Sequence, residues 1–229
     1  MKIKILGTIG MHEKSARKHS KRSGILIDDK ILFDLGEKEY LIYKPDYIFL
    51  THLHPDHAIF IEEEIFNIEI PVHAPNYSKR LPDLKIIREE VNLDSYKITP
   101  IPTHHSKSLD SVAYLIENNQ NNRILYTGDL IWIDKEYHYL LENLDLIIAD
   151  GSFLRKGGMT RKDSKTGQLF GHNGIPDLIK FLKPFTNKIV FTHFGSWFFE
   201  DIEKSKKEII SLYDSINIEV AYDGMEINL

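Results

Sequence analysis

Thr51-His52-Leu53-His54-Pro55-Asp56-His57 places three imidazoles and a carboxylate directly after Tyr47-Ile48-Phe49-Leu50, an apolar run that we expect to be a buried strand. Alternate side chains of an extended segment point the same way, so His52 and His54 can reach one metal ion together. Pro55 disfavours a helical conformation at His54 and suits the first turn of a helix beginning near Asp56, which puts Asp56 and His57 on a new surface. The stretch therefore predicts a metal site with room for a second ion.

The ligand types indicate which metals suit the site. Imidazole and carboxylate are natural ligands of zinc and also of manganese or iron, and the chain has no cysteine to supply a thiolate. The H-x-H-x-D-H pattern after a strand resembles the signature of the metallo-β-lactamase superfamily. Within it, Leu6-Gly7-Thr8-Ile9-Gly10 and His105-Ser106-Lys107 resemble ribonuclease Z-like and cyclic-phosphodiesterase-like members. The resemblance implies two divalent metal ions, zinc first, with manganese or iron as alternatives.

Length and composition are typical of a soluble globular protein. The chain has 229 residues, of which 42% are hydrophobic, and a formal charge of -5, so we expect one domain over 1–229 with a substantial core. The lack of cysteine excludes disulfides and fits a reducing compartment. The start of the chain is too short and too alternating for a signal peptide, and no apolar run approaches the ~20 residues of a membrane span. We expect a cytoplasmic protein without membrane association.

The order of predicted elements favours an α/β fold. Strands over 2–6, 24–27 and 31–33 open the chain, and helices are expected over 58–64, 175–182 and 198–213. The stretch 153–168 has no periodicity and predicts a long loop or an excursion. Strands and helices alternate in two similar halves, which, with the resemblance, implies a four-layer αβ/βα sandwich whose loops gather at one edge.

Further motifs follow in the order of the superfamily. One of His104 and His105 should complete the first metal site; His105 is preferred, with His104 as a neighbour supporting the ligands. Asp129 follows the predicted strand 123–127, and a carboxylate there can bridge two cations because one oxygen faces each. By resemblance, His52, His54 and His105 hold the first ion, Asp56, His57 and His193 the second, and Asp129 both.

Three other residues have predicted roles beside the metals. Asp34, in Phe33-Asp34-Leu35-Gly36, and Asp150, at the end of a predicted strand, resemble carboxylates that support the metal loops from behind. A plain turn residue is the alternative for Asp34. His172, ahead of the predicted helix 175–182, resembles a histidine that faces the scissile phosphate and protonates a leaving alkoxide. A structural or helix-capping histidine is the alternative for His172.

The predicted loop 153–168 is basic. Arg155, Lys156, Arg161 and Lys162 are expected to contact an anionic substrate, since Asp163 is the only carboxylate of this loop. A solvated charged loop is the alternative.

The predicted chemistry is hydrolysis by a metal-bridging hydroxide that Asp56 orients. The first hypothesis is a phosphodiesterase acting on RNA, as a nuclease, or on a small cyclic or nucleotide phosphodiester. No long glycine- and proline-rich excursion of the kind that clamps transfer RNA is evident, which favours the small diester. A lactonase or thioesterase of the same fold is the alternative, and a non-enzymatic scaffold that binds a nucleotide or a partner is a third hypothesis. Whether the chain forms a homo-oligomer is left open.

Overall fold

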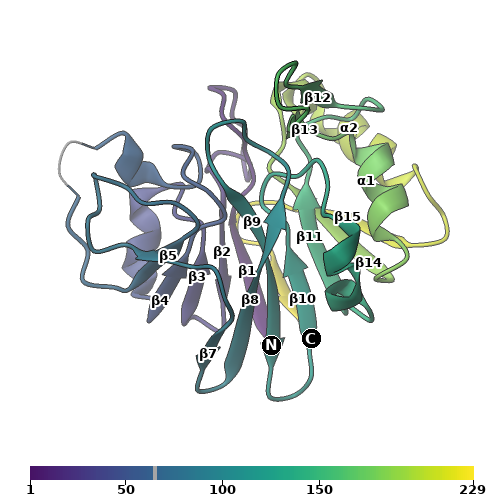
Figure 1. The fold of residues 1–229 in the computed structure, drawn as a ribbon. Coiled ribbons are helices and arrows are strands. Elements are labelled where there is room, and N and C mark those ends of the chain that lie inside the picture. Colours follow the sequence, from purple (N-terminus) through teal and green to yellow (C-terminus); the bar gives the residue numbers. More distant parts are fainter. Residues whose placement is uncertain (64–65) are drawn as a thin grey trace.

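Two facing β-sheets form the centre of the computed structural model, which describes residues 1–63 and 66–229 (Figure 1). The first sheet has the order β16 (Glu226–Asn228), β1 (Lys2–Gly7), β2 (Gly24–Ile27), β3 (Ile31–Phe33), β4 (Tyr47–Phe49), β5 (Val72–Ala74) and β6 (Lys85–Ile86). The second has the order β15 (Asn217–Val220), β14 (Lys188–Thr192), β11 (Leu146–Asp150), β10 (Arg123–Tyr126), β9 (Ser111–Asn118), β8 (Tyr96–Thr103) and β7 (Val91–Leu93).

Helices cover the outer faces of both sheets. The first sheet carries η1 (Lys38–Tyr43) and η2 (Ile59–Ile61), and the second carries η3 (Lys135–Leu141), α1 (Ile175–Leu182), η4 (Ser196–Phe199) and α2 (Ile202–Ile210) (Figure 1). Neighbouring residues of a strand point to opposite faces, so Ile148 packs between the sheets while Ile147 packs against α1. A third apolar cluster lies under η1 and η2. The four-layer αβ/βα sandwich predicted from the sequence is confirmed.

Strand direction gathers the functional loops. Strands β3 and β4 are parallel, as are β10, β11 and β14. Because β8 and β10 are both antiparallel to β9, they also run in one direction. Side chains that follow the carboxyl ends of parallel strands meet at one edge of a sheet, which is where ligands bind in open α/β folds.

The stretch 153–168, predicted to be a long loop or an excursion, is an excursion that includes a strand the sequence did not predict. It contains β12 (Met159–Lys162), which pairs antiparallel with β13 (Leu169–His172) in a separate two-stranded sheet. Neither face of this hairpin is buried. The apolar alternation that reveals a half-buried strand is therefore absent from its sequence.

Two predicted helices are shorter than expected. The helix predicted over 58–64 is reduced to η2, and its last residue lies outside the described part of the chain. The helix predicted over 198–213 is divided into η4 and α2, because Asp201 has an extended backbone and its side chain caps α2 by accepting a hydrogen bond from the Lys204 amide. Within the described residues, no helix has the length and apolar character needed to cross a bilayer.

A buried histidine anchors the loop that follows β1. The Thr8 hydroxyl donates to Asp223, so it accepts from Nδ1 of His19 at 3.0 Å. Nε2 of His19 is then unprotonated, and among the described residues it has no hydrogen-bond partner. Burial lowers the pKa of His19 to about 4; Asp223 and Glu203 oppose this shift, and Lys206 adds to it.

This histidine should make the fold sensitive to mild acid. In the unfolded chain His19 takes up a proton at its ordinary pKa of about 6.5, whereas in the folded chain it stays neutral until about pH 4. The free energy of unfolding should therefore decrease as the pH is lowered from about 6.5 to about 4. His19→Gln should reduce the slope of stability against pH in this window, as measured by urea denaturation followed by circular dichroism. Equal slopes for the two proteins would contradict the assignment.

Candidate metal centre

The loops after four strands bring the predicted metal ligands together. The segment from His52 to His57 follows β4, His105 follows β8, Asp129 follows β10 and His193 follows β14. All of these predicted ligands are buried except His54, which is half-buried. They form two groups of nitrogen and oxygen atoms that share one carboxylate.

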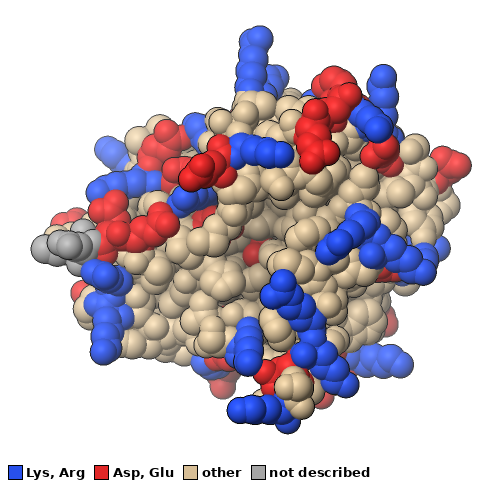
Figure 2. Space-filling model, turned by 90° about the horizontal axis from the view of Figure 1, so that it is seen from above, with Lys and Arg blue, Asp and Glu red and all other residues tan. Residues whose placement is uncertain are grey.

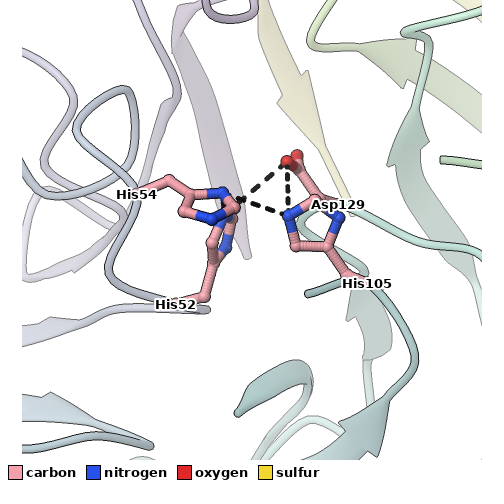
Figure 3. Close-up of side chains that lie close together, drawn as sticks. All are labelled: His52, His54, His105 and Asp129. Atoms are coloured by element: carbon pink, nitrogen blue, oxygen red, sulfur yellow. Dashed lines mark hydrogen bonds and ion pairs between the residues drawn. The ribbon is translucent and has the colours of Figure 1, made fainter. Parts of the chain in front are cut away.

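The first group consists of His52, His54, His105 and Asp129 (Figure 3). Nδ1 of His54 lies 3.0 Å from Nε2 of His52 and 3.2 Å from Nε2 of His105. Oδ2 of Asp129 lies 3.6 Å from Nε2 of His52 and 3.3 Å from Nε2 of His105. A tetrahedral zinc ion with bonds of ~2.0–2.1 Å has ligand atoms about 3.3 Å apart, so these spacings suit a single ion.

The second group consists of Asp56, His57 and His193. Nε2 of His57 and Nε2 of His193 lie 3.9 and 3.7 Å from Oδ2 of Asp56, and 3.1 and 3.2 Å from Oδ1 of Asp129. Asp129 therefore turns one oxygen toward each group. In the described part of the chain, its Oδ1 is buried and makes no hydrogen bond in spite of these two close nitrogens, an arrangement that fits a cation between them.

Burial and charge prepare these groups for cations. Burial lowers the pKa of His52, and that of His105 to about 4, which keeps both rings in the neutral form that binds metal. Burial opposes charge on Asp129 as well, but His193 and His57 hold the pKa of its carboxyl well below the usual range. Burial disfavours a charged His57, yet Asp129 and Asp34 raise its pKa well above normal. The carboxylates thus attract positive charge to this point.

Asp34 holds the segment from Thr51 to His57 in place through hydrogen bonds. Its carboxylate accepts hydrogen bonds from the Thr51 amide at 2.8 Å, the Thr51 hydroxyl at 3.0 Å, Nδ1 of His57 at 2.7 Å and the Tyr126 hydroxyl at 2.7 Å. Because Nδ1 of His57 donates to Asp34, Nε2 is the nitrogen that would bind a metal ion beside Asp129. Asp34 also joins the two sheets, since Tyr126 belongs to β10.

Two other ligands are oriented in the same way. Nδ1 of His105 donates to the Gly171 carbonyl at 2.9 Å, and the Gly171 amide donates back to the His105 carbonyl at 2.6 Å. Nδ1 of His193 lies 2.8 Å from the Ser23 hydroxyl. His193 has a left-handed backbone, with φ of 56°, which a residue other than glycine keeps only where its surroundings hold it.

Asp150 and His172 lie beside the first group, and with Asp129 and His193 they form a third set of side chains that could hold a metal ion. Asp150 accepts hydrogen bonds from Nδ1 of His172 at 2.8 Å and from the amides of Leu130 and Ser152. Nε2 of His172 lies 3.8 Å from Oδ2 of Asp129. Burial opposes charge on this ring, but Asp150 and Asp129 raise the pKa of His172 to about 9. His172 is the last residue of β13, and it lies close to α1 without capping it.

A cavity of about 1020 Å³ opens above the two groups, with a carboxylate visible at its base (Figure 2). His54, Asp56, His105, Asp129, His172 and His193 line its inner part. Of the four basic residues predicted to contact substrate, Arg155 lines the cavity, with its guanidinium 5.6 Å from the centre of the Phe153 ring. Lys156, Arg161 and Lys162 do not line it.

His104 does not support the ligands as predicted. Its backbone pairs with Trp132, and its Nε2 lies 3.1 Å from the carboxylate of Asp134. It belongs to none of the groups that could hold a metal. Consecutive residues of an extended segment point to opposite sides, so placing His105 in the cluster turns His104 away from it.

Sequence reasoning missed several residues of the site. Thr51 directly precedes His52, and Tyr126 closely precedes Asp129. Their positions in the sequence therefore indicated a supporting role. Ser23 and Trp197 offered none, because Ser23 lies in a loop and Trp197 in the short helix η4, and the path of each depends on the whole fold.

The fold and the cluster define a candidate metalloprotein of the metallo-β-lactamase type. The family model described as the beta-lactamase superfamily domain matches residues 35–194, and the chain belongs to this family. The predicted resemblance is thus confirmed. Family membership and the His/Asp cluster support a metal-dependent hydrolase. No curated protein matches the chain significantly in sequence.

Solved structures share the fold over nearly the whole chain. The metallo-beta-lactamase fold protein YhfI from Bacillus subtilis is 18% identical with a TM-score of 0.69, and the match covers 99% of each chain. A diphosphatase from the PhnP family is 15% identical with a TM-score of 0.67, over 100% of this chain and 97% of that one. Human tRNase Z, short form, is 17% identical with a TM-score of 0.64, over 100% and 99%.

Ser23→Ala should weaken metal binding at the second group without unfolding the protein. The substitution removes the hydroxyl that holds Nδ1 of His193, and loss of such an outer contact typically costs about 10–100-fold in metal affinity. A zinc titration against a chromophoric chelator measures the effect. Ser215→Ala, at an exposed position, is the matched control. Unchanged affinity in the Ser23 variant would show that the hydroxyl does not orient His193.

Proposed function

We propose that this protein is a metal-dependent phosphodiesterase that uses two divalent ions, zinc first, with manganese or iron as alternatives, on a small phosphodiester. His52, His54 and His105 would hold one ion, Asp56, His57 and His193 the other, and Asp129 both. The observation that carries the proposal is the position of Asp129, whose two oxygens face the two groups separately.

Two residues of this chain suit the two proton transfers of such a reaction, one at the attacking water and one at the leaving alkoxide. When bound, two such ions supply a water of lowered pKa and polarise a phosphoryl oxygen. Asp56 lines the cavity beside the second group, where it can orient the attacking water. Asp150 holds Nδ1 of His172, which leaves Nε2 toward the cavity to protonate the alkoxide as its bond to phosphorus breaks. Proton uptake by Asp56 and release by His172 would then balance.

Two observations favour a phosphate ester, and two more favour a small one. The PhnP-family protein is called a diphosphatase and human tRNase Z is named for transfer RNA, although both are under 20% identical to this chain. Arg155 adds a cation to the cavity wall. The cavity of about 1020 Å³ has the size of a small-molecule site. Arg161 and Lys162, which could attract RNA, lie outside it, and this favours a small diester.

A lactonase or thioesterase is the second candidate. An isothiocyanate hydrolase from Delia radicum gut bacteria has the same fold, with a TM-score of 0.66 and 14% identity, and its name specifies no phosphate. Leu154, Met159 and Trp197 also give the cavity an apolar wall that would accept an acyl chain. A non-enzymatic scaffold is disfavoured because every predicted ligand position is filled by a side chain that can bind metal.

A substrate panel separates these candidates. Protein loaded with zinc or manganese should hydrolyse bis(p-nitrophenyl) phosphate, and a lactone and thioester panel should give far lower kcat/KM. His54→Ala should lose at least about 100-fold in kcat/KM, since it removes a ligand central to the first group. His104→Ala is the matched control and should retain activity. Lactone turnover without diester turnover would reverse the ranking.

The role of His172 predicts a dependence on the leaving group. His172→Ala should lower kcat by about 10²–10⁴-fold for a diester with an alkyl leaving group, which needs a proton. The loss should be small for p-nitrophenolate, which departs without one. Kinetics of both substrates, with metal content measured by mass spectrometry, test this. An equal loss on both substrates would indicate that His172 positions other groups and does not donate the proton.

A further inference from the structure

The cavity has an outer part that the metal centre does not explain. It extends from the two metal groups between the segment 152–159 and the segment from Gly195 to Glu208, which includes η4 and the start of α2. Substrate bound at the metals must place one of its two ester groups in this outer part or along its wall. The chemistry of the outer wall therefore restricts what that group can be.

Part of this wall is apolar. Phe153, Leu154, Met159 and Trp197 line it. The indole N–H of Trp197 donates to the Ser152 carbonyl at 2.7 Å, so its single donor is already used and its ring offers hydrocarbon surface. Such a wall favours a flat or apolar group.

The charged side chains of the outer part are mainly acidic. Glu200, Asp201 and Glu208 line it, against the cations Arg155 and Lys204. Lys204 lies 3.9 Å from Glu208, and Arg155 keeps its charge because its contacts are the neutral Gly158 carbonyl and the Phe153 ring, so three carboxylates face two cations. The outer part is thus negative overall, in contrast to the inner part, where cations are expected. A second phosphate would be repelled from it.

We propose that the substrate carries a single phosphate, and that its ester group in the outer part is apolar and has no further negative charge. This inference rests on the proposed phosphodiesterase function and narrows it. It excludes RNA and polyphosphorylated nucleotides as good substrates, because each would bring additional phosphates against Glu200, Asp201 and Glu208.

Two substrates that differ by one phosphate test the proposal. Thymidine 5′-(p-nitrophenyl phosphate) and the same compound with a second phosphate on its 3′ hydroxyl release the same leaving group. For the metal-loaded protein, kcat/KM should be at least about tenfold lower for the doubly phosphorylated compound at low ionic strength. Added salt should reduce this ratio, since it screens exposed charges.

Variants in α2 and at the end of η4 test whether the acidic wall causes the difference in kcat/KM between the two compounds. The double substitution Glu200→Gln and Glu208→Gln should bring the ratio at least about threefold closer to one. Glu203→Gln is the matched control, because Glu203 lies on the same helix but pairs with Lys206 and does not line the cavity. It should keep the ratio of the unchanged protein.

The outcomes separate the two proposals. Turnover of the singly phosphorylated compound with an equal or higher kcat/KM for the doubly phosphorylated one overturns this inference and leaves the phosphodiesterase function standing. A preference for the singly phosphorylated compound that the double variant does not change also overturns it, because the acidic wall would then not be the cause. If neither compound is hydrolysed in zinc or manganese, the proposed function fails and this inference fails with it.

Discussion

The central constraint of this structure is a buried carboxylate surrounded by imidazoles. Asp129 is buried, so its charge needs partners within the protein, and the rings of His57, His105 and His193 face it from different loops. These loops can meet only if the carboxyl ends of β4, β8, β10 and β14 come to one edge of the facing sheets. The arrangement of the two sheets therefore determines whether the charged and titratable side chains around Asp129 come together.

Much of the fold could be predicted from the sequence because its decisive signals are local. The stretch from His52 to His57 has ligand spacing set by strand geometry, and the helix from Ile175 to Leu182 was predicted with its observed bounds since Pro176 and an apolar stripe mark it. The hairpin of β12 and β13 could not be predicted, because its strands are held by backbone hydrogen bonds and bury neither face.

The site was predictable where a motif carries it and unpredictable where distance in sequence separates the partners. Asp34 and Asp150 stood out at strand ends, but their hydrogen bonds to Tyr126 and His172 join strands far apart in the chain. The basic residues show the same limit. Composition indicated that residues 153–168 are cationic, yet only coordinates could separate Arg155, which lines the cavity, from Arg161 and Lys162, which do not.

The exchange of hydrogen bonds between Gly171 and His105 ties the hairpin to the metal centre mechanically. The Gly171 carbonyl holds the ring of His105, and its amide holds the backbone of the same residue. Gly171 has φ of 111° and a Cβ there would clash with the Met159 carbonyl, so no other residue fits this clamp. A displacement of the exposed tip of the hairpin would thus move the ring of His105, so the hairpin controls the position of one candidate metal ligand.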